Sequence, residues 1–349
     1  MKFFKKYFRN NFQKTIKNIL GFASSNKMSI PNRYKSLLNR TLPTFLPEPD
    51  SVESYLKQLD INTVTCVNYA HRRLGVFPEF IVTLVYLQEL GISFNQITSL
   101  PESICNLSSL SVLYCQYNKL TSLPESICHL SSLSVLICND NRLKSLPESI
   151  GSLSSLEEFN INFNQLIDLP ESIGSLNNLK LLYCSNNQLV SLPDSIRSLS
   201  SLDEFDISYN QFISLPNSIG SLNNLKEFYC ENNQLTSLPE SICNLSGLTT
   251  LFCCNNKLKC FPDSICNLSD LTTLFCNDNQ LESLPDLINL EEILYNNNPL
   301  TKLPKSFHFV IKNSKIQAHL HKEYIKIKRT LCKQLIIDLD VVSVVLDFF

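Results

Sequence analysis

Glycine is scarce in this 349-residue sequence, which has seven glycines and none of the Gly-rich loops that bind phosphate groups. P-loop and dinucleotide-binding proteins need such loops to bring backbone amides close to a phosphate. The sequence has no C-x-x-C motif with the partner spacing of a zinc site. Its five histidines belong to no recognisable nucleophile or metal motif. We therefore expect a protein that is not an enzyme, with no catalytic residues, no cofactor and no metal site.

Long hydrophobic runs are also missing from the start of the sequence. Residues 1–22 are too highly charged, and their apolar stretch is too short, for a membrane span or a secretory signal. We therefore expect a cytoplasmic protein in a reducing compartment, where its fourteen cysteines remain thiols. The alternatives for the cysteines are disulfides between neighbouring repeats or a metal site.

The sequence contains a 23-residue repeat, marked by regularly spaced asparagines. Within each unit the apolar positions follow L-x-x-L-x-(L/I/C)-x-x-N-x-L-x-x-L-P-x-S-I-x-x-L. Self-similarity at this period is typical of a solenoid, in which each unit buries its apolar edge against its neighbours. The repeated asparagines are Asn95, Asn118, Asn141, Asn164, Asn187, Asn210, Asn233, Asn256 and Asn279.

Each unit has a simple physical interpretation, here for the second regular one. Leu110, Leu113 and Cys115 fit a short strand with alternate residues pointing inward. Asn118 follows the strand, where its amide can satisfy backbone groups that would otherwise be buried without partners. Pro124 suits the start of a short helical or 3-10 segment that returns the chain to the core.

This pattern resembles the leucine-rich repeat, and the 23-residue form with L-P-x-S-I resembles its intracellular Ras-group subclass. The resemblance covers roughly residues 64–304 and about 11 coils. It implies an α/β fold, a curved solenoid with a parallel β-sheet on the concave face, short helical or 3-10 segments on the convex face, and helical caps at both ends. It also suggests a small GTPase, or a signalling complex around one, as the first partner class to test.

The cysteines follow the same repeat. We expect most of them to act as small buried hydrophobes, whereas Cys254 should lie on the surface beside buried Cys253. One set occupies the third core position of the strand: Cys115, Cys138, Cys184, Cys230, Cys253 and Cys276. The other follows the helical isoleucine: Cys105, Cys128, Cys243 and Cys266.

We divide the chain into five segments. Residues 1–22 form a basic amphipathic helix, 23–49 a linker, 50–63 an N-terminal cap helix, 64–304 the repeat array, and 305–349 a C-terminal helical cap with an apolar tail. The last coil of the array should begin four residues early, because its helical side shortens to PDLINL.

The role of residues 1–22 stays open between a disordered segment and three roles for a helix. The helix can lie on an anionic membrane surface, resemble a mitochondrial targeting peptide or fold back as a cap, and Met28 can be an alternative start. The residues that would contact a membrane surface are Phe4, Phe8, Phe12, Lys5, Lys6 and Arg9.

Charge is strongly segregated along the chain, although the formal net charge is only −2. Residues 1–47 hold ten Lys or Arg and no acidic residue, and residues 302–333 hold nine against one. The repeat body must therefore be acidic, which disfavours nucleic acid as its ligand. A basic or neutral protein partner fits this charge better.

The expected binding surface is the concave face of the strands. The residue four positions before each asparagine should point outward, as should the glutamates six positions before. Exposed aromatic residues in a row are typical anchors of protein interfaces, although neighbouring rings can simply stack along the sheet. The acidic residues can steer a basic partner or merely keep the surface solvated. The candidate binding residues are Tyr114, Tyr183, Asp206, Tyr229, Phe252, Phe275, Glu158, Glu204, Glu227 and, two positions before its asparagine, Glu231.

The sequence thus predicts a non-catalytic scaffold or adaptor that binds another protein through the concave face. It is expected in the cytoplasm, with a possible peripheral position at a membrane surface. The alternative is a host-directed effector or ubiquitin-pathway adaptor, in which the repeats select a target. The oligomeric state is left open.

Overall fold

The computed structural model describes residues 63–301 and 303–304. Four of the predicted segments, 1–22, 23–49, 305–349 and almost all of 50–63, lie outside the described residues and stay predictions. The described residues cover almost all of the predicted repeat array, 64–304.

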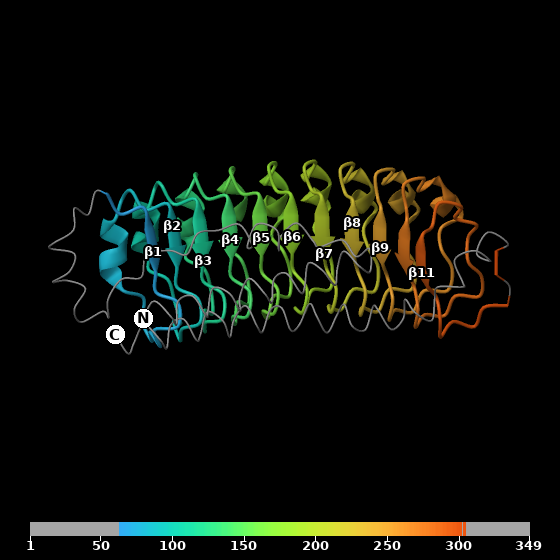
Figure 1. Ribbon diagram of the computed structural model, residues 1–349, viewed down its shortest axis with the longest axis horizontal. Helices are drawn as coiled ribbons and strands as arrows, with labels where there is room; N and C mark the ends of the chain where they lie inside the picture. Colours follow the sequence, from blue (N-terminus) through green and yellow to red (C-terminus); the bar gives the residue numbers. More distant parts are fainter. Residues whose placement is uncertain (1–62, 302, 305–349) are drawn as a thin grey trace, which may run out of the picture. The chain divides into compact units, whose positions relative to one another are not determined.

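The strands of the described region form one parallel sheet of eleven strands in chain order, side by side along the long axis (Figure 1). Each strand has only three residues, because the chain must leave the sheet at once to complete its coil. The strands are β1 (Cys66–Asn68), β2 (Glu89–Gly91), β3 (Val112–Tyr114), β4 (Val135–Ile137), β5 (Glu158–Asn160), β6 (Leu181–Tyr183), β7 (Glu204–Asp206), β8 (Glu227–Tyr229), β9 (Thr250–Phe252), β10 (Thr273–Phe275) and β11 (Glu292–Leu294).

Short 3-10 helices return the chain from one strand to the next. Proline precedes most of them with an extended backbone, as at Pro124 (φ −68°), and the following isoleucine points into the core. The helices are η2 (Glu79–Thr83), η3 (Glu102–Asn106), η4 (Glu125–His129), η5 (Ile150–Ser152), η6 (Glu171–Ser175), η7 (Asp194–Ser198), η8 (Asn217–Ser221), η9 (Glu240–Asn244) and η10 (Asp263–Asn267).

The strand register reproduces the sequence period. Val112 of β3 pairs with Val135 of β4, one full repeat later. At the end of the array, Thr273 of β10 pairs with Glu292 of β11, four residues short of a full repeat. In the described chain no 3-10 helix joins β10 to β11. The prediction of a shortened last coil is therefore confirmed.

The core is a continuous stack of apolar side chains between the sheet and the 3-10 helices. The middle residue of each strand, such as Leu113, is fully buried, as is the isoleucine of each helix, such as Ile127. Burying a side chain of this size contributes about 1.5–3 kcal/mol. Because one coil has no core of its own, this stabilisation comes from contact between neighbouring coils.

The repeated asparagines join neighbouring coils by hydrogen bonds, as the sequence predicts. The Nδ2 group of Asn118 donates to the carbonyl of Cys115 in its own coil (3.1 Å) and to that of Ile92 in the preceding coil (2.9 Å). Its Oδ1 accepts from the backbone N–H of Ile97 at 3.0 Å. One buried amide thus satisfies backbone groups of two coils that would be costly to leave unpaired.

A feature absent from the sequence prediction is a left-handed residue immediately before each asparagine of the ladder. Its φ lies between 52° and 56° before the nine repeated asparagines and is 62° at His71, which precedes Arg72 in the first coil; none of these residues is a glycine. Some are asparagine or aspartate, which tolerate this conformation, and others are aromatic, which usually avoid it. His71, Phe94 and Tyr117 occupy this position in three consecutive coils, and their rings stack with successive centroid distances of 4.3 Å. Stacking thus offsets part of the backbone strain.

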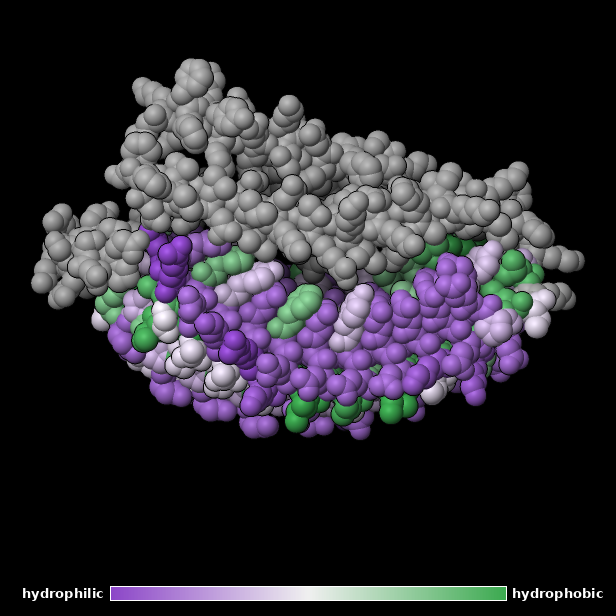
Figure 2. Space-filling view, turned by 90° about the horizontal axis from the view of Figure 1, so that it is seen from below, coloured by the Kyte–Doolittle hydropathy of each residue, from purple (hydrophilic) through white to green (hydrophobic). Residues whose placement is uncertain are grey.

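Much of the side of the array seen in Figure 2 is hydrophilic.

The cysteine predictions are confirmed at one set of positions and partly wrong at the other. The six strand cysteines are all buried, and burial raises the pKa of thiols such as Cys138 and Cys184. In the second set Cys128 and Cys243 are buried, whereas Cys105 is only half-buried and Cys266 is exposed. Cys254 was expected on the surface but is buried on the concave side, where burial raises its pKa. All cysteines within the described residues are free thiols.

Candidate functional site on the concave face

The three-residue strands decide which side chains face the concave side. Neighbouring residues of a strand point to opposite faces, so a middle residue such as Phe228 enters the core while Glu227 and Tyr229 share the other face. The candidates at the two outer strand positions therefore lie together as predicted. Glu231 follows the end of β8 and is half-buried.

The structure brings the predicted aromatic residues into direct register. Tyr229 pairs with Phe252, Phe252 with Phe275, and Phe275 with Leu294. The ring of Tyr229 meets that of Phe252 edge-on at 5.0 Å between centroids, and Phe252 stacks on Phe275 at 4.3 Å. These four residues, which we call the concave apolar cluster, are separate from the main core.

The prediction that this row is exposed is wrong for most of its members. Tyr183 is fully buried, and Tyr229, Phe252 and Phe275 retain 5%, 9% and 5% of their exposed surface. Tyr114 is half-buried. Adjacent strands lie only about 4.8 Å apart, so large side chains in register pack against one another. The aromatic ladder therefore contributes to packing, which was the alternative interpretation of the row.

The acidic candidates gather at the centre of the same face. Glu158, Glu204 and Glu227 are the first residues of β5, β7 and β8, and Glu204 lies directly opposite Glu227. Glu204 and Asp206 are buried, whereas Glu158 and Glu227 are half-buried. These carboxylates and the aromatic residues thus lie on the same face of the sheet, where Glu204 and Asp206 are buried.

Hydrogen bonds hold these carboxylates in place. These hydrogen bonds were not predicted from the sequence. The hydroxyl of Tyr183 donates to Glu204 Oε2 at 2.8 Å, and that of Tyr229 donates to Glu227 Oε2 at 2.5 Å. The backbone N–H and hydroxyl of Ser208 donate to Asp206 Oδ1 at 3.0 Å and 2.6 Å. A signal was present, since Glu227 and Tyr229 are two residues apart and so share one face of a strand.

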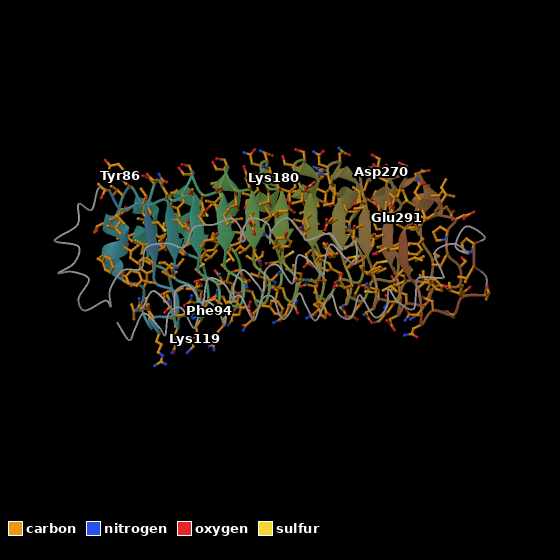
Figure 3. The ribbon with its side chains drawn as sticks, in the orientation of Figure 1. Tyr86, Phe94, Lys119, Lys180, Asp270 and Glu291 are labelled. Carbon is orange, nitrogen blue, oxygen red and sulfur yellow. The ribbon has the colours of Figure 1, made fainter. Side chains whose placement is uncertain are left out.

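Ion pairs lie elsewhere in the described region. Lys180 pairs with Glu157 at 2.8 Å and Lys226 with Asp203 at 2.6 Å. Figure 3 shows Lys180 at the edge of the solenoid opposite the one that bears Phe94 and Lys119. Lys180, Glu157 and Lys226 are exposed and Asp203 is half-buried, so both ion pairs are largely solvated and contribute little to stability.

The described residues contain no cluster of three or more His, Cys, Asp or Glu that could hold a metal ion. Nor does any helix among them have the length and apolarity to cross a membrane. The candidates for membrane-surface contact, Phe4, Phe8, Phe12, Lys5, Lys6 and Arg9, lie outside the described residues.

Comparison with protein families identifies the repeats. Residues 54–166 match the leucine-rich repeat region, residues 223–268 a two-copy leucine-rich repeat, and residues 178–199 a single leucine-rich repeat. The chain contains leucine-rich repeats. This part of the predicted resemblance is confirmed, and the solenoid above is the fold that such repeats form. No curated protein matches the sequence.

Solved leucine-rich repeat structures share the fold. The ectodomain of the plant membrane receptor kinase GASSHO1/SCHENGEN3 from Arabidopsis thaliana, in complex with CASPARIAN STRIP INTEGRITY FACTOR 2, is 28% identical with a TM-score of 0.60, over 71% of this chain and 34% of its own. A leucine-rich repeat protein of Leptospira interrogans is 29% identical with a TM-score of 0.50, over 81% and 90%. The Arabidopsis receptor kinase HAESA, in complex with the peptide hormone IDA and the co-receptor SERK1, is 26% identical with a TM-score of 0.58, over 74% and 52%. The chain thus spans about a third and about half of the two plant structures.

Proposed function

We propose that this chain is a non-catalytic cytoplasmic scaffold that binds a basic segment of a partner protein on its concave face. Leucine-rich repeat proteins generally mediate protein–protein interactions, and their fold is typically a non-catalytic interaction scaffold. The observation that supports a basic partner is the group of carboxylates Glu204, Asp206 and Glu227 on two adjacent strands.

The electrostatics of this group favour a cationic ligand. Like charges directly opposite each other in a sheet are destabilising, and Glu204 and Glu227 occupy such positions. A Lys or Arg from a partner would form charge-assisted hydrogen bonds with carboxylates of this group. Since the Tyr183 and Tyr229 hydroxyls already fix two of the carboxylates, binding would require little further ordering of these side chains.

The concave apolar cluster has a supporting role in this proposal. Its rings are largely buried, so they pack β8, which carries Glu227, against β9 and β10 instead of acting as free anchors. The half-buried side chains Glu158, Glu227 and Glu231 then become the principal contacts for a partner. Electrostatic complementarity of this kind sets specificity and association rate more than affinity.

Two comparisons are consistent with a peptide or protein ligand. The GASSHO1/SCHENGEN3 and HAESA structures are complexes with CASPARIAN STRIP INTEGRITY FACTOR 2 and with the peptide hormone IDA. For the partner class, the resemblance of the L-P-x-S-I repeats to the Ras-group subclass makes a small GTPase, or a protein of its signalling complex, the first to test.

The test compares partner recovery by the full-length wild type and by Glu158→Gln/Glu227→Gln/Glu231→Gln. Glutamine keeps the size of each side chain and an acceptor oxygen while removing the charge. The matched control is Glu102→Gln/Glu125→Gln/Glu171→Gln, which removes three exposed charges from the 3-10 helices. Circular dichroism must first show that all three proteins are equally folded.

We expect partners to be lost from the concave variant and kept by the control, with recovery falling as salt concentration rises. A purified small GTPase is tested in the same format. Equal partner recovery by the wild type and the concave variant would contradict the proposal, and loss from both variants would indicate a general charge effect.

A further inference from the structure

An exposed apolar strip lies on a different surface of the solenoid. Ile167, Val190 and Ile213 occupy the same position in three consecutive coils, each directly after the apolar residue that follows the asparagine. They retain 56%, 56% and 61% of their exposed surface. Figure 2 views the array from below, and along its lower margin a short row of hydrophobic side chains interrupts a hydrophilic surface.

The strip is continuous because the backbones of its coils are joined. The N–H of Gln188 donates to the carbonyl of Leu166 at 2.8 Å, and that of Gln211 to the carbonyl of Leu189 at 2.9 Å. The three apolar side chains therefore follow one another at about the 4.8 Å spacing of adjacent strands. In the same coils, Phe163 and Tyr209 stand four residues before Ile167 and Ile213 and are also exposed.

The charges around the strip differ from those of the concave face. In the coil before the strip, Lys144 occupies the position of Ile167, and Arg142 lies two residues earlier. Two coils after the strip, Lys259 occupies the same position, and Lys257 lies two residues earlier. Of the residues that directly follow Ile167, Val190 and Ile213 in the sequence, only the first, Asp168, is charged. The two ion pairs among the described residues involve none of these cations. The strip is therefore an apolar centre with positive charge at both ends.

We propose that this strip binds an amphipathic α-helix of a partner protein, with apolar residues on successive turns and acidic residues beyond both ends of the apolar stripe. The turn of an α-helix rises about 5.4 Å, close to the spacing of the coils, so residues i, i+3 or i+4, and i+7 can each meet one member. An extended strand presents side chains on one face every ~6.4–6.8 Å, which matches the spacing of the coils less well.

The distance between the lysines at the two ends of the strip gives the expected length of the partner helix. Lys144 and Lys259 are five repeats apart, or about 24 Å at the strand spacing. An α-helix of about 16 residues covers this distance. Its acidic residues should lie near both ends, and its apolar residues in the central two turns.

Charge disfavours the two basic segments of this chain as the occupant, and helix length disfavours the described part of a second copy. Segments 1–47 and 302–333 are strongly basic, so the cations at both ends of the strip would repel them. The described part of a second copy offers only 3-10 helices of three to five residues. The surface lies outside the concave face, so this inference does not depend on the proposed function.

The test measures binding of a fluorescent 16-residue synthetic helix, with Leu at i, i+4 and i+7 and Glu at both ends, to the full-length protein by anisotropy. A second peptide has Lys in place of each Glu. The protein variants are Ile167→Ser/Val190→Ser/Ile213→Ser and Lys144→Glu/Lys259→Glu. The control, Val76→Ser/Val85→Ser/Tyr86→Ser, removes three other exposed apolar side chains.

We expect the Glu-ended peptide to bind the wild type and the control equally. The serine variant should bind at least about tenfold more weakly, because it loses the apolar contact area. The charge variant should also bind more weakly and prefer the Lys-ended peptide.

Several results would overturn the proposal. They are no binding of the Glu-ended peptide to the wild type, equal binding by the serine variant, a preference of the wild type for the Lys-ended peptide, and a concentration-dependent dimer in sedimentation that the serine variant lacks. Binding to phosphatidylserine vesicles that the serine variant loses would likewise replace a partner helix with a membrane surface.

Discussion

The hydroxyl of Tyr183 in β6 donates a 2.8 Å hydrogen bond to Oε2 of Glu204 in the next strand, β7. Both side chains are buried. A buried carboxylate is stable only when hydrogen bonds replace the water that it has lost. This contact therefore does two things, since it joins two coils on the concave face and fixes one carboxylate of the proposed binding surface.

We predict that Tyr183→Phe lowers the free energy of unfolding by about 1–3 kcal/mol, because the buried Glu204 loses a donor while the ring packing is kept. Urea denaturation followed by circular dichroism measures this change. The control is Tyr86→Phe, which removes a hydroxyl from an exposed ring and should leave stability unchanged. Equal stability of Tyr183→Phe and wild type would show that this hydrogen bond contributes nothing.

The repeat explains why so much of the fold could be predicted. The same side-chain requirements recur every 23 residues, so one set of physical arguments for Leu113, Asn118 and Pro124 applies to each coil. The observed register of β3 with β4 and the early start of β11 follow directly from this counting.

The burial of the concave face could not be predicted in the same way. Alternation along a strand tells which face Tyr229 and Phe252 occupy, but not how closely neighbouring rings pack across the sheet. The left-handed residues before the asparagines were also missed, since aromatic residues such as Phe94 give no local signal for a positive φ. Both features depend on contacts between coils, which sequence spacing describes only indirectly.

Close contact between coils predicts a strong effect at Gly174 in η6. A Cβ atom added there would lie 2.3 Å from the carbonyl oxygen of Ser195 in the next coil, and the same contact recurs at Gly151 and Gly220. We expect Gly174→Ala to lower the free energy of unfolding by about 1–3 kcal/mol, as overpacking does. Thermal unfolding measures the loss.

Gly247→Ala is the matched control for this substitution. Its added Cβ would be 3.9 Å from the nearest atom outside its chain neighbours. We expect no loss of stability and a gain of up to about 1 kcal/mol, because alanine reduces the entropy of the unfolded chain. If the two variants unfold at the same temperature, the steric contact at Gly174 is unimportant.

The left-handed position before the asparagine predicts a stabilising substitution. Phe163 has φ 53° and an exposed ring, whereas the equivalent residue of the next coil is Asn186 at φ 54°. Asparagine tolerates this conformation better than phenylalanine. We expect Phe163→Asn to raise the free energy of unfolding by about 0.5–1 kcal/mol, and the reverse substitution, Asn186→Phe, to lower it. A loss of stability in Phe163→Asn would mean that ring contacts outweigh the backbone strain.

The carboxyl group of Glu292, at the start of β11, predicts a pH dependence of stability. Burial, followed by the nearby charge of Glu291, raises its pKa in the folded chain. Between the unfolded and folded pKa values, the folded chain binds more protons than the unfolded chain. Stability therefore falls as pH rises through this interval, and the penalty is fully present above it.

Glu292→Gln removes this penalty, so we expect the variant to be more stable than wild type at pH 7. The difference should vanish below about pH 4, where glutamate is protonated in both states. Urea denaturation at pH 3.5 and pH 7 measures it, with the exposed Glu282→Gln as a control for the loss of one charge. A stability difference that is the same at both pH values would instead indicate a packing effect of the amide at the start of β11.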